Sequence, residues 1–329
     1  MGNRFTKCRI KLTFKNYSEQ QQEVFDKATM AETDQASMDD STKNITIPTT
    51  KREFHDVQTS TYWLPKDDSE QMRLSAQHYA LKEVFKTNVL SSVIEMLDFD
   101  RGIDILDVGC GPGAWIIVNT DMMDDYPNCR YQGCDMVDVI NRKTMPEQLR
   151  FCTGNVVEGL PYADNTFDFV HMRLFVLALR SDEWPKAIKE ILRVTKSGGI
   201  VQVLEPNLDL PKETDNLFYK ANKALHIICQ QRGQIPSVGR ELERMLREAG
   251  NTKILESVYI PTDTTTGTIA AKKLAWSWSE GARGAMSVLG PAMGVTDEVE
   301  QQKFVKDFHK CMLTKCGFYN FNAVAAQKL

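Results

Sequence analysis

Along the middle of the chain, short and mostly apolar runs alternate with segments that have helical periodicity. The runs lie at residues 104–108, 131–135, 150–153, 167–172 and 200–204. Runs of this length are typical of buried strands. Before the last run, Ile188, Ile191 and Leu192 recur at the spacing of one helix face, and Ser181 is a capping residue. This alternation predicts an α/β, doubly wound parallel sheet with ligands at the carboxyl ends of its strands.

Helical patterns flank this region on both sides. Before it, Tyr62-Trp63-Leu64-Pro65 leads into a helix that starts near Asp67. Arg73 and Gln77 share one face of this helix, and such residues either reach over a ligand or face solvent. After the region, helices are predicted at 217–232 and 239–249, and strands at 253–260 and 318–326.

Residues 264–316 have a helical pattern that is rich in tryptophan and methionine. Flexible apolar side chains of this kind suit a lid over an acceptor pocket. A satellite pair of helices with its own packed core has the same pattern, so both interpretations stay open.

Composition limits the classes of function. The net charge of -4 and the pI near 5.8 argue against a general nucleic-acid binder, so we expect no nucleic-acid partner. The eight cysteines form no C-x-x-C pair, and no metal site is predicted. No apolar run is long enough to span a membrane, and no secretion leader is visible. We expect a cytoplasmic protein, and the sequence is also compatible with a nuclear location.

The first 55 residues are predicted to be a flexible tail, since the polar run at 31–50 has little apolar surface to bury. The extreme terminus, Met1-Gly2-Asn3-Arg4-Phe5-Thr6, matches the N-myristoylation pattern. Five basic residues within 4–15, or palmitate on Cys8, would supply the second signal that stable membrane contact needs. The alternative is a chance match in a solvated basic end.

The first strand leads directly into Gly109, Gly111 and Gly113, in the sequence Asp-Val-Gly-Cys-Gly-Pro-Gly. Glycine lets bare backbone approach a bound cofactor. Gly109, Gly111 and Ala114 satisfy the dinucleotide fingerprint. Asp107, two residues before the first glycine, is instead typical of an S-adenosylmethionine loop. The loop alone does not separate these two cofactors.

Polar side chains stand at the ends of the later strands. Asp135 ends the second strand, where a carboxylate can bind both hydroxyls of a ribose. Asn155 follows the third strand, and its amide suits the edge of an adenine. His171 closes the fourth strand. Because the carboxyl ends of parallel strands share one edge, we expect these residues to meet there with Asp107.

These segments resemble the class I S-adenosylmethionine-dependent methyltransferases. The motifs that carry the resemblance are the glycine loop at 104–115, Cys134-Asp135-Met136, 160–173 and 190–199. Tyr62-Trp63-Leu64-Pro65 is similar to the lead-in of a fungal branch that includes methyltransferase-type regulators of secondary metabolism. The resemblance implies a Rossmann-like, mostly parallel seven-stranded sheet with helices on both faces and an antiparallel final strand.

We therefore expect one methyltransferase domain over residues 56–329. Its predicted parts are a helical lead-in at 56–100, a cofactor-binding core at 101–206, and a C-terminal part at 207–329 with the lid insertion at 264–316. The resemblance implies S-adenosyl-L-methionine as cofactor and a small-molecule or protein methyl acceptor. The cofactor-binding residues that it implies are Tyr62, Arg73, Asp107, Gly109, Cys110, Gly111, Gly113, Asp135, Met136, Asn155, Val156 and Met172.

His171 is the candidate general base, and its alternative role is to line the methionine end of the cofactor. Two other functions remain open. One is a non-catalytic regulatory protein that retains the cofactor pocket. The other is an NAD(P)-dependent oxidoreductase, whose Y-x-x-x-K spacing occurs at Tyr219 and Lys223, although no serine partner precedes it at a suitable distance.

Overall fold

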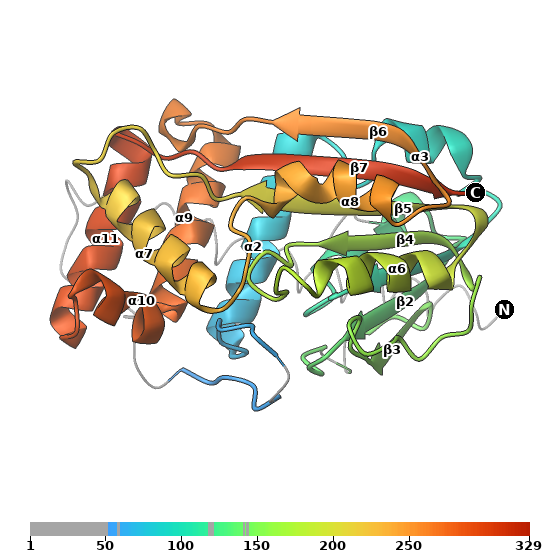
Figure 1. Cartoon of the computed structure of the whole chain (residues 1–329), viewed down its shortest axis with the longest axis horizontal. Helices are drawn as coiled ribbons and strands as arrows, with labels where there is room; N and C mark the ends of the chain where they lie inside the picture. Colours follow the sequence, from blue (N-terminus) through green and yellow to red (C-terminus); the bar gives the residue numbers. More distant parts are fainter. Residues whose placement is uncertain (1–51, 58–59, 118–121, 141, 143–144) are drawn as a thin grey trace, which may run out of the picture.

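The computed structural model describes residues 52–57, 60–117, 122–140, 142 and 145–329, and it contains one seven-stranded sheet over these residues (Figure 1). The strand order is β3-β2-β1-β4-β5-β7-β6. The strands are β1 Asp104–Val108, β2 Arg130–Asp135, β3 Leu149–Thr153, β4 Phe167–Arg173, β5 Thr195–Asn207, β6 Thr252–Ile260 and β7 Asn320–Lys328.

All neighbouring strands from β3 to β5 run parallel, whereas β7 runs antiparallel to both β5 and β6. The central strands are buried on both faces: Ile105, Leu106, Phe169 and Val170 are fully inaccessible to solvent. This explains why their sequences read as apolar runs and not as alternating patterns. The predicted fold, including the antiparallel final strand, is confirmed.

Helices cover the sheet and gather beyond one of its ends. They are α2 Asp68–Phe85, α3 Ser91–Met96, α4 Ala114–Ile117, α5 Met122–Asp125, α6 Trp184–Val194, α7 Leu217–Gln231, α8 Leu242–Glu248, α9 Ile269–Gly284, α10 Met286–Met293 and α11 Glu298–Thr314, with the short 3-10 turns η1 Val238–Glu241 and η2 Thr264–Thr266. In Figure 1, α7, α9, α10 and α11 cluster beyond the end of the sheet toward which β4 and β5 point.

The lead-in helix α2 joins this cluster to the sheet. It begins at an N-cap, Asp67, whose carboxylate accepts a hydrogen bond from the backbone N–H of Glu70 at 3.1 Å. The helix then packs along α9. Residues 60–67 precede it as an extended segment, which we call the strap.

Several predicted boundaries differ from the structure. The segment predicted as one helix at 239–249 is η1 followed by α8, and the strand predicted at 318–326 is β7, which begins two residues later. The myristoylation motif and nearly all of the predicted tail lie outside the described residues, so they stay predictions. Within the described part of the chain, no helix is both long and apolar enough to cross a membrane.

Candidate active site

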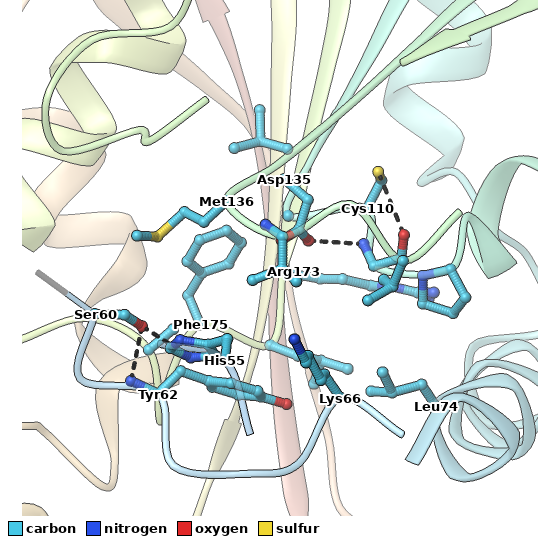
Figure 2. A pocket seen from close by; sticks show the side chains of 18 of the residues that line it. His55, Ser60, Tyr62, Lys66, Leu74, Cys110, Asp135, Met136, Arg173 and Phe175 are labelled. Atoms are coloured by element: carbon cyan, nitrogen blue, oxygen red, sulfur yellow. Dashed lines mark hydrogen bonds between the residues drawn. The ribbon is translucent and has the colours of Figure 1, made fainter. Parts of the chain in front are cut away.

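A cavity lies at the carboxyl ends of the parallel strands, beside the loop that follows β1. In Figure 2, Cys110, Asp135 and Met136 lie on one side of it, and Tyr62 and Lys66 lie on the other. The sheet edge and the strap therefore face each other across the cavity. The predicted cofactor residues that line it are Tyr62, Asp107, Gly109, Cys110, Gly111, Asp135, Met136, Asn155 and Val156.

The glycine loop has a backbone that ordinary residues avoid. Gly109, Gly111 and Gly113 have φ angles of 67°, 52° and 82°. The backbone N–H groups of Gly109 and Cys110 both donate to the carbonyl of Cys134, at 2.7 and 3.2 Å. A Cβ atom on Gly109 would lie 2.4 Å from Cζ of Phe175, so a larger residue here would have to displace the end of that ring.

Asp135, at the end of β2, is held by the same loop. Its carboxylate accepts hydrogen bonds from the backbone N–H of Gly111 at 2.9 Å and of Val137 at 3.0 Å. Burial raises the pKa of this carboxyl, although the two backbone donors act in the opposite direction. Asp135 thus presents a half-buried carboxylate to the cavity in a fixed orientation, which suits recognition of a diol.

Asp107 and His171 lie side by side in the register of β1 and β4. Nδ1 of His171 is 2.8 Å from Oδ1 of Asp107, and the imidazole ring stacks on Trp115. Burial lowers the pKa of His171, an effect that Asp107 partly offsets, so the ring is neutral near pH 7. Asp107 lines the cavity, whereas His171 is not among its lining residues.

Three further predicted residues are also not among the lining residues of the cavity. Gly113 and Met172 belong to the loop and to β4, and Met172 is fully buried. Arg73 points from α2 toward α9: its guanidinium pairs with Glu70 at 2.6 Å and donates to Oγ of Ser277 at 3.4 Å. Glu70 itself lines the cavity, so Arg73 lies one side chain behind its wall.

Sequence reasoning missed several residues around the cavity. Lys66, Arg173 and Phe175 line it, and Figure 2 shows Lys66 and Arg173 within the same space. Behind them, the fully buried carboxylate of Glu205 accepts from the backbone N–H groups of Phe175 at 2.7 Å and Val176 at 2.9 Å. The only feature of the sequence that indicates this contact is a single acidic residue in the apolar run of β5.

A family match covers the segment that contributes most of the sheet edge at this cavity. Residues 105–199 match the family model described as a methyltransferase domain. The matched segment begins in β1 and ends in β5, so it contains the glycine loop, Asp135 and Asn155. Over these residues the chain carries a methyltransferase domain. The expected family and fold are thereby confirmed.

Curated relatives of this chain include fungal proteins. The secondary metabolism regulator laeA of Coprinopsis cinerea is 31% identical over 156 residues, which cover 47% of this chain and 38% of the relative. Methyltransferase pytC of Aspergillus terreus is 25% identical over 209 residues, 60% of each chain. A demethylmenaquinone methyltransferase of Staphylococcus aureus is 27% identical over 67% of this chain and 98% of its own. The matches thus span about two fifths to three fifths of the first two relatives.

Solved structures with a similar backbone include a phosphoethanolamine N-methyltransferase of Haemonchus contortus in complex with S-adenosyl-L-methionine. It has a TM-score of 0.48 and 14% identity, over 79% of this chain and 57% of that chain. The [4+2]-cyclase SpnF has a TM-score of 0.45 and 20% identity, and the match covers 79% of this chain and 96% of SpnF. The fold assignment rests on the strand order and the family match, not on these similarities.

Proposed function

We propose that this protein transfers a methyl group from S-adenosyl-L-methionine to a small-molecule or protein acceptor. The observation that carries the proposal is the pairing of Asp135 with Gly111. Through this hydrogen bond, the acid at the end of β2 contacts the glycine loop, whose glycines have left-handed backbone. Both residues line the same cavity. The residues present fit the cofactor in charge and shape.

In this proposal each part of the wall has a role. Asp107 and the backbone of the glycine loop hold the amino-acid end of the cofactor. Asp135 binds the ribose hydroxyls. Met136 and Val156 enclose the adenine ring, and Asn155 meets its polar edge. When bound, the cofactor supplies a methyl group on a sulfonium, which is already activated toward in-line displacement.

The chain's own contribution is then to bind, orient and exclude water. Displacement is fastest when the acceptor is held in line and close to the methyl group. The strap lies across the cavity from the sheet edge, with the half-buried Tyr62 on its wall, and would separate the reacting atoms from solvent. A general base is needed only for an acceptor that arrives protonated, and His171 remains the candidate for that step.

The dinucleotide alternative is less well supported. The dinucleotide-binding sheet has the order 3-2-1-4-5-6, whereas here β7 is inserted between β5 and β6 and runs antiparallel to both. A regulatory protein would bind the cofactor in the same pocket. It would differ from an active methyltransferase only because it does not turn over an acceptor. Both alternatives can be tested directly.

Isothermal titration of the full chain with S-adenosylhomocysteine and, separately, with NAD⁺ tests the cofactor. We expect binding of S-adenosylhomocysteine in the micromolar range, with Kd near 1 to about 100 μM, and none of NAD⁺. The reverse result would replace this proposal with the oxidoreductase. Methyl transfer from labelled cofactor into small-molecule and protein fractions of an extract then tests turnover. Cofactor binding without any labelled product would favour the regulatory protein.

A further inference from the structure

Lys66 of the strap lies where the cofactor cavity opens to solvent. Its side chain is exposed, and it is also one of the residues that line the cavity. In Figure 2, Lys66 lies across the cavity from Cys110 and Asp135. A molecule that enters the cavity therefore meets an ammonium group at the opening.

Hydrogen bonds on both sides of Lys66 hold its backbone in place. Its N–H donates to the carbonyl of Glu53 at 2.7 Å, and its carbonyl accepts from Nε2 of Gln71 at 3.4 Å. The next residue, Asp67, accepts two hydrogen bonds from the guanidinium of Arg52, at 2.6 and 2.7 Å, and it also caps α2. The position of the Lys66 backbone relative to the cavity is therefore fixed, and only its side chain moves freely.

Two acidic residues close to Lys66 in the chain are paired with arginine. Asp67 pairs with Arg52 at 2.6 Å, and Glu70 pairs with the buried Arg73 at 2.6 Å. Among the residues that the structure describes, Lys66 forms no ion pair of its own. Its ammonium group is thus available to an anionic group of a ligand.

The charges of the cofactor match the other charged side chains of the cavity. Besides Lys66 and the paired Glu70, these are Asp107, Asp135 and Arg173. S-adenosylmethionine carries two positive groups, the sulfonium and the ammonium, and one carboxylate. Two acids and one arginine have the opposite charges. Lys66 is therefore a positive charge that the cofactor leaves without a counterpart.

Arg173 is the cation suited to the carboxylate of the cofactor. It follows Met172, which lies opposite Val108 in the parallel pairing of β4 with β1. Since the glycine loop begins directly after Val108, Arg173 lies beside that loop at the same edge of the sheet. The proposed function assigns the amino-acid end of the cofactor to this loop, whereas Lys66 lies on the opposite wall.

We propose that the methyl acceptor is a small carboxylic acid, and that its carboxylate pairs with the ammonium group of Lys66 at the opening of the cavity. The inference rests on the proposed methyl transfer. A single ammonium group neutralises a carboxylate, whereas a phosphate dianion would keep an unbalanced charge. A carboxylic acid is also ionised near pH 7, and a phenol is not.

Binding of benzoate to the full chain tests the site, and benzamide is the matched probe without a charge. Each probe is titrated into protein that is saturated with S-adenosylhomocysteine, and ligand-observed nuclear magnetic resonance measures the affinity. We expect benzoate to bind saturably with a Kd of about 1 to 10 mM. It should bind about fivefold more tightly than benzamide, which is the effect of one partly exposed ion pair.

Three variants make the test specific. Lys66→Gln removes the charge, so benzoate should bind no more tightly than benzamide, while the affinity for S-adenosylhomocysteine stays within about twofold of the parent. Lys66→Arg keeps the charge and should keep the preference for benzoate. Lys189→Gln is the matched control, because Lys189 is an exposed lysine of α6 that does not line the cavity. It changes the net charge equally and should bind both probes as the parent does.

The outcomes separate this inference from the proposed function. If the parent binds S-adenosylhomocysteine but does not prefer benzoate, the inference alone is overturned. A preference that persists in Lys66→Gln also overturns it, because benzoate then binds elsewhere. If Lys66→Gln instead binds S-adenosylhomocysteine more than about fivefold more weakly, Lys66 serves the cofactor and not the acceptor. Failure of S-adenosylhomocysteine to bind the parent overturns the proposed methyl transfer, and the assignment of an acceptor falls with it.

Discussion

Oδ1 of Asp107 lies 2.8 Å from Nδ1 of His171, and the imidazole stacks on Trp115 with ring centroids 4.0 Å apart. A carboxylate only accepts hydrogen bonds, so Nδ1 of the neutral ring carries the proton and donates it to Asp107. His171 and Trp115 together fix the orientation of a carboxylate that lines the cofactor cavity. We therefore predict that His171 acts as a positioning residue for Asp107, and the variants below separate this role from that of a general base.

Replacing His171 with Phe tests that role, because Phe keeps the stacking on Trp115 and removes only the donor. We expect the Kd for S-adenosylhomocysteine to rise about tenfold, the effect of losing one hydrogen bond to a charged group. The turnover number at saturating cofactor should change little. A general base would instead lower the turnover number by roughly 10² to 10⁴.

A second variant, Asp107→Asn, serves as the comparison. If His171 acts through Asp107, the double variant should bind S-adenosylhomocysteine no more weakly than the weaker single variant. If the losses of S-adenosylhomocysteine binding free energy in the two single variants simply added up in the double variant, the positioning role would be contradicted. A fall in turnover number with unchanged cofactor affinity would instead support the general base.

The sequence predicted the strands, the glycine loop and the acids at the strand ends because each depends on local periodicity or on a general rule of parallel sheets. Asp107, Asp135 and Asn155 meet at one cavity for that reason. The direction of Arg73 was not predictable, since it depends on Ser277, 204 residues away in the chain. Likewise, the contact of Glu205 with the loop at Phe175 joins residues 30 apart, and no local pattern specifies it.

Asp135→Asn should weaken cofactor binding without unfolding the protein. Both carboxylate oxygens accept from backbone N–H groups, and the amide of Asn can serve only one of them. We expect a loss of about 1 to 3 kcal/mol in unfolding free energy and about a tenfold to hundredfold higher Kd for S-adenosylhomocysteine. Urea unfolding and calorimetric titration measure the two effects.

The pH dependence of cofactor binding tests the same residue. Burial raises the pKa of Asp135, so in the unliganded protein its carboxylate takes up a proton at a higher pH than an ordinary aspartate does. As the pH is lowered, the affinity for S-adenosylhomocysteine should therefore begin to fall at a higher pH than it would if the binding carboxylate were exposed. The Asn variant should lack this dependence, and equal pH profiles for the two proteins would exclude Asp135 from binding.

Gly109→Ala should disrupt the glycine loop for two separable reasons. The φ of 67° costs a residue with a side chain about 1 to 2 kcal/mol, and the new Cβ would lie 2.4 Å from Cζ of Phe175. Gly198→Ala is the matched control, since its φ is 81° but no atom lies within 4 Å of the added Cβ. Urea unfolding should show a larger loss for Gly109→Ala, and only this variant should bind S-adenosylhomocysteine more weakly. Equal losses in both variants would mean that Phe175 does not constrain the loop.

Glu205 should make stability depend on pH in an unusual direction. Burial raises its pKa from 4.5 to about 8, and the carboxylate faces the backbone N–H groups of Phe175 and Val176. Because the folded protein binds the proton more tightly than the unfolded chain, this residue's contribution to stability is complete below pH 4.5. It decreases as the pH rises to about 8, by at most about 1.4 kcal/mol per pH unit.

Glu205→Gln isolates this contribution. The amide of Gln does not titrate, and all other titratable groups of the variant are the same as in the parent protein. At pH 5 the variant should be less stable by about 1 to 3 kcal/mol, since the amide nitrogen cannot accept from one of the two N–H groups. The difference between the proteins should then narrow steadily toward pH 8, and urea unfolding at each pH measures it. Parallel stability profiles would show that Glu205 is ionised in both states, held as an anion by the backbone of the loop that carries Phe175.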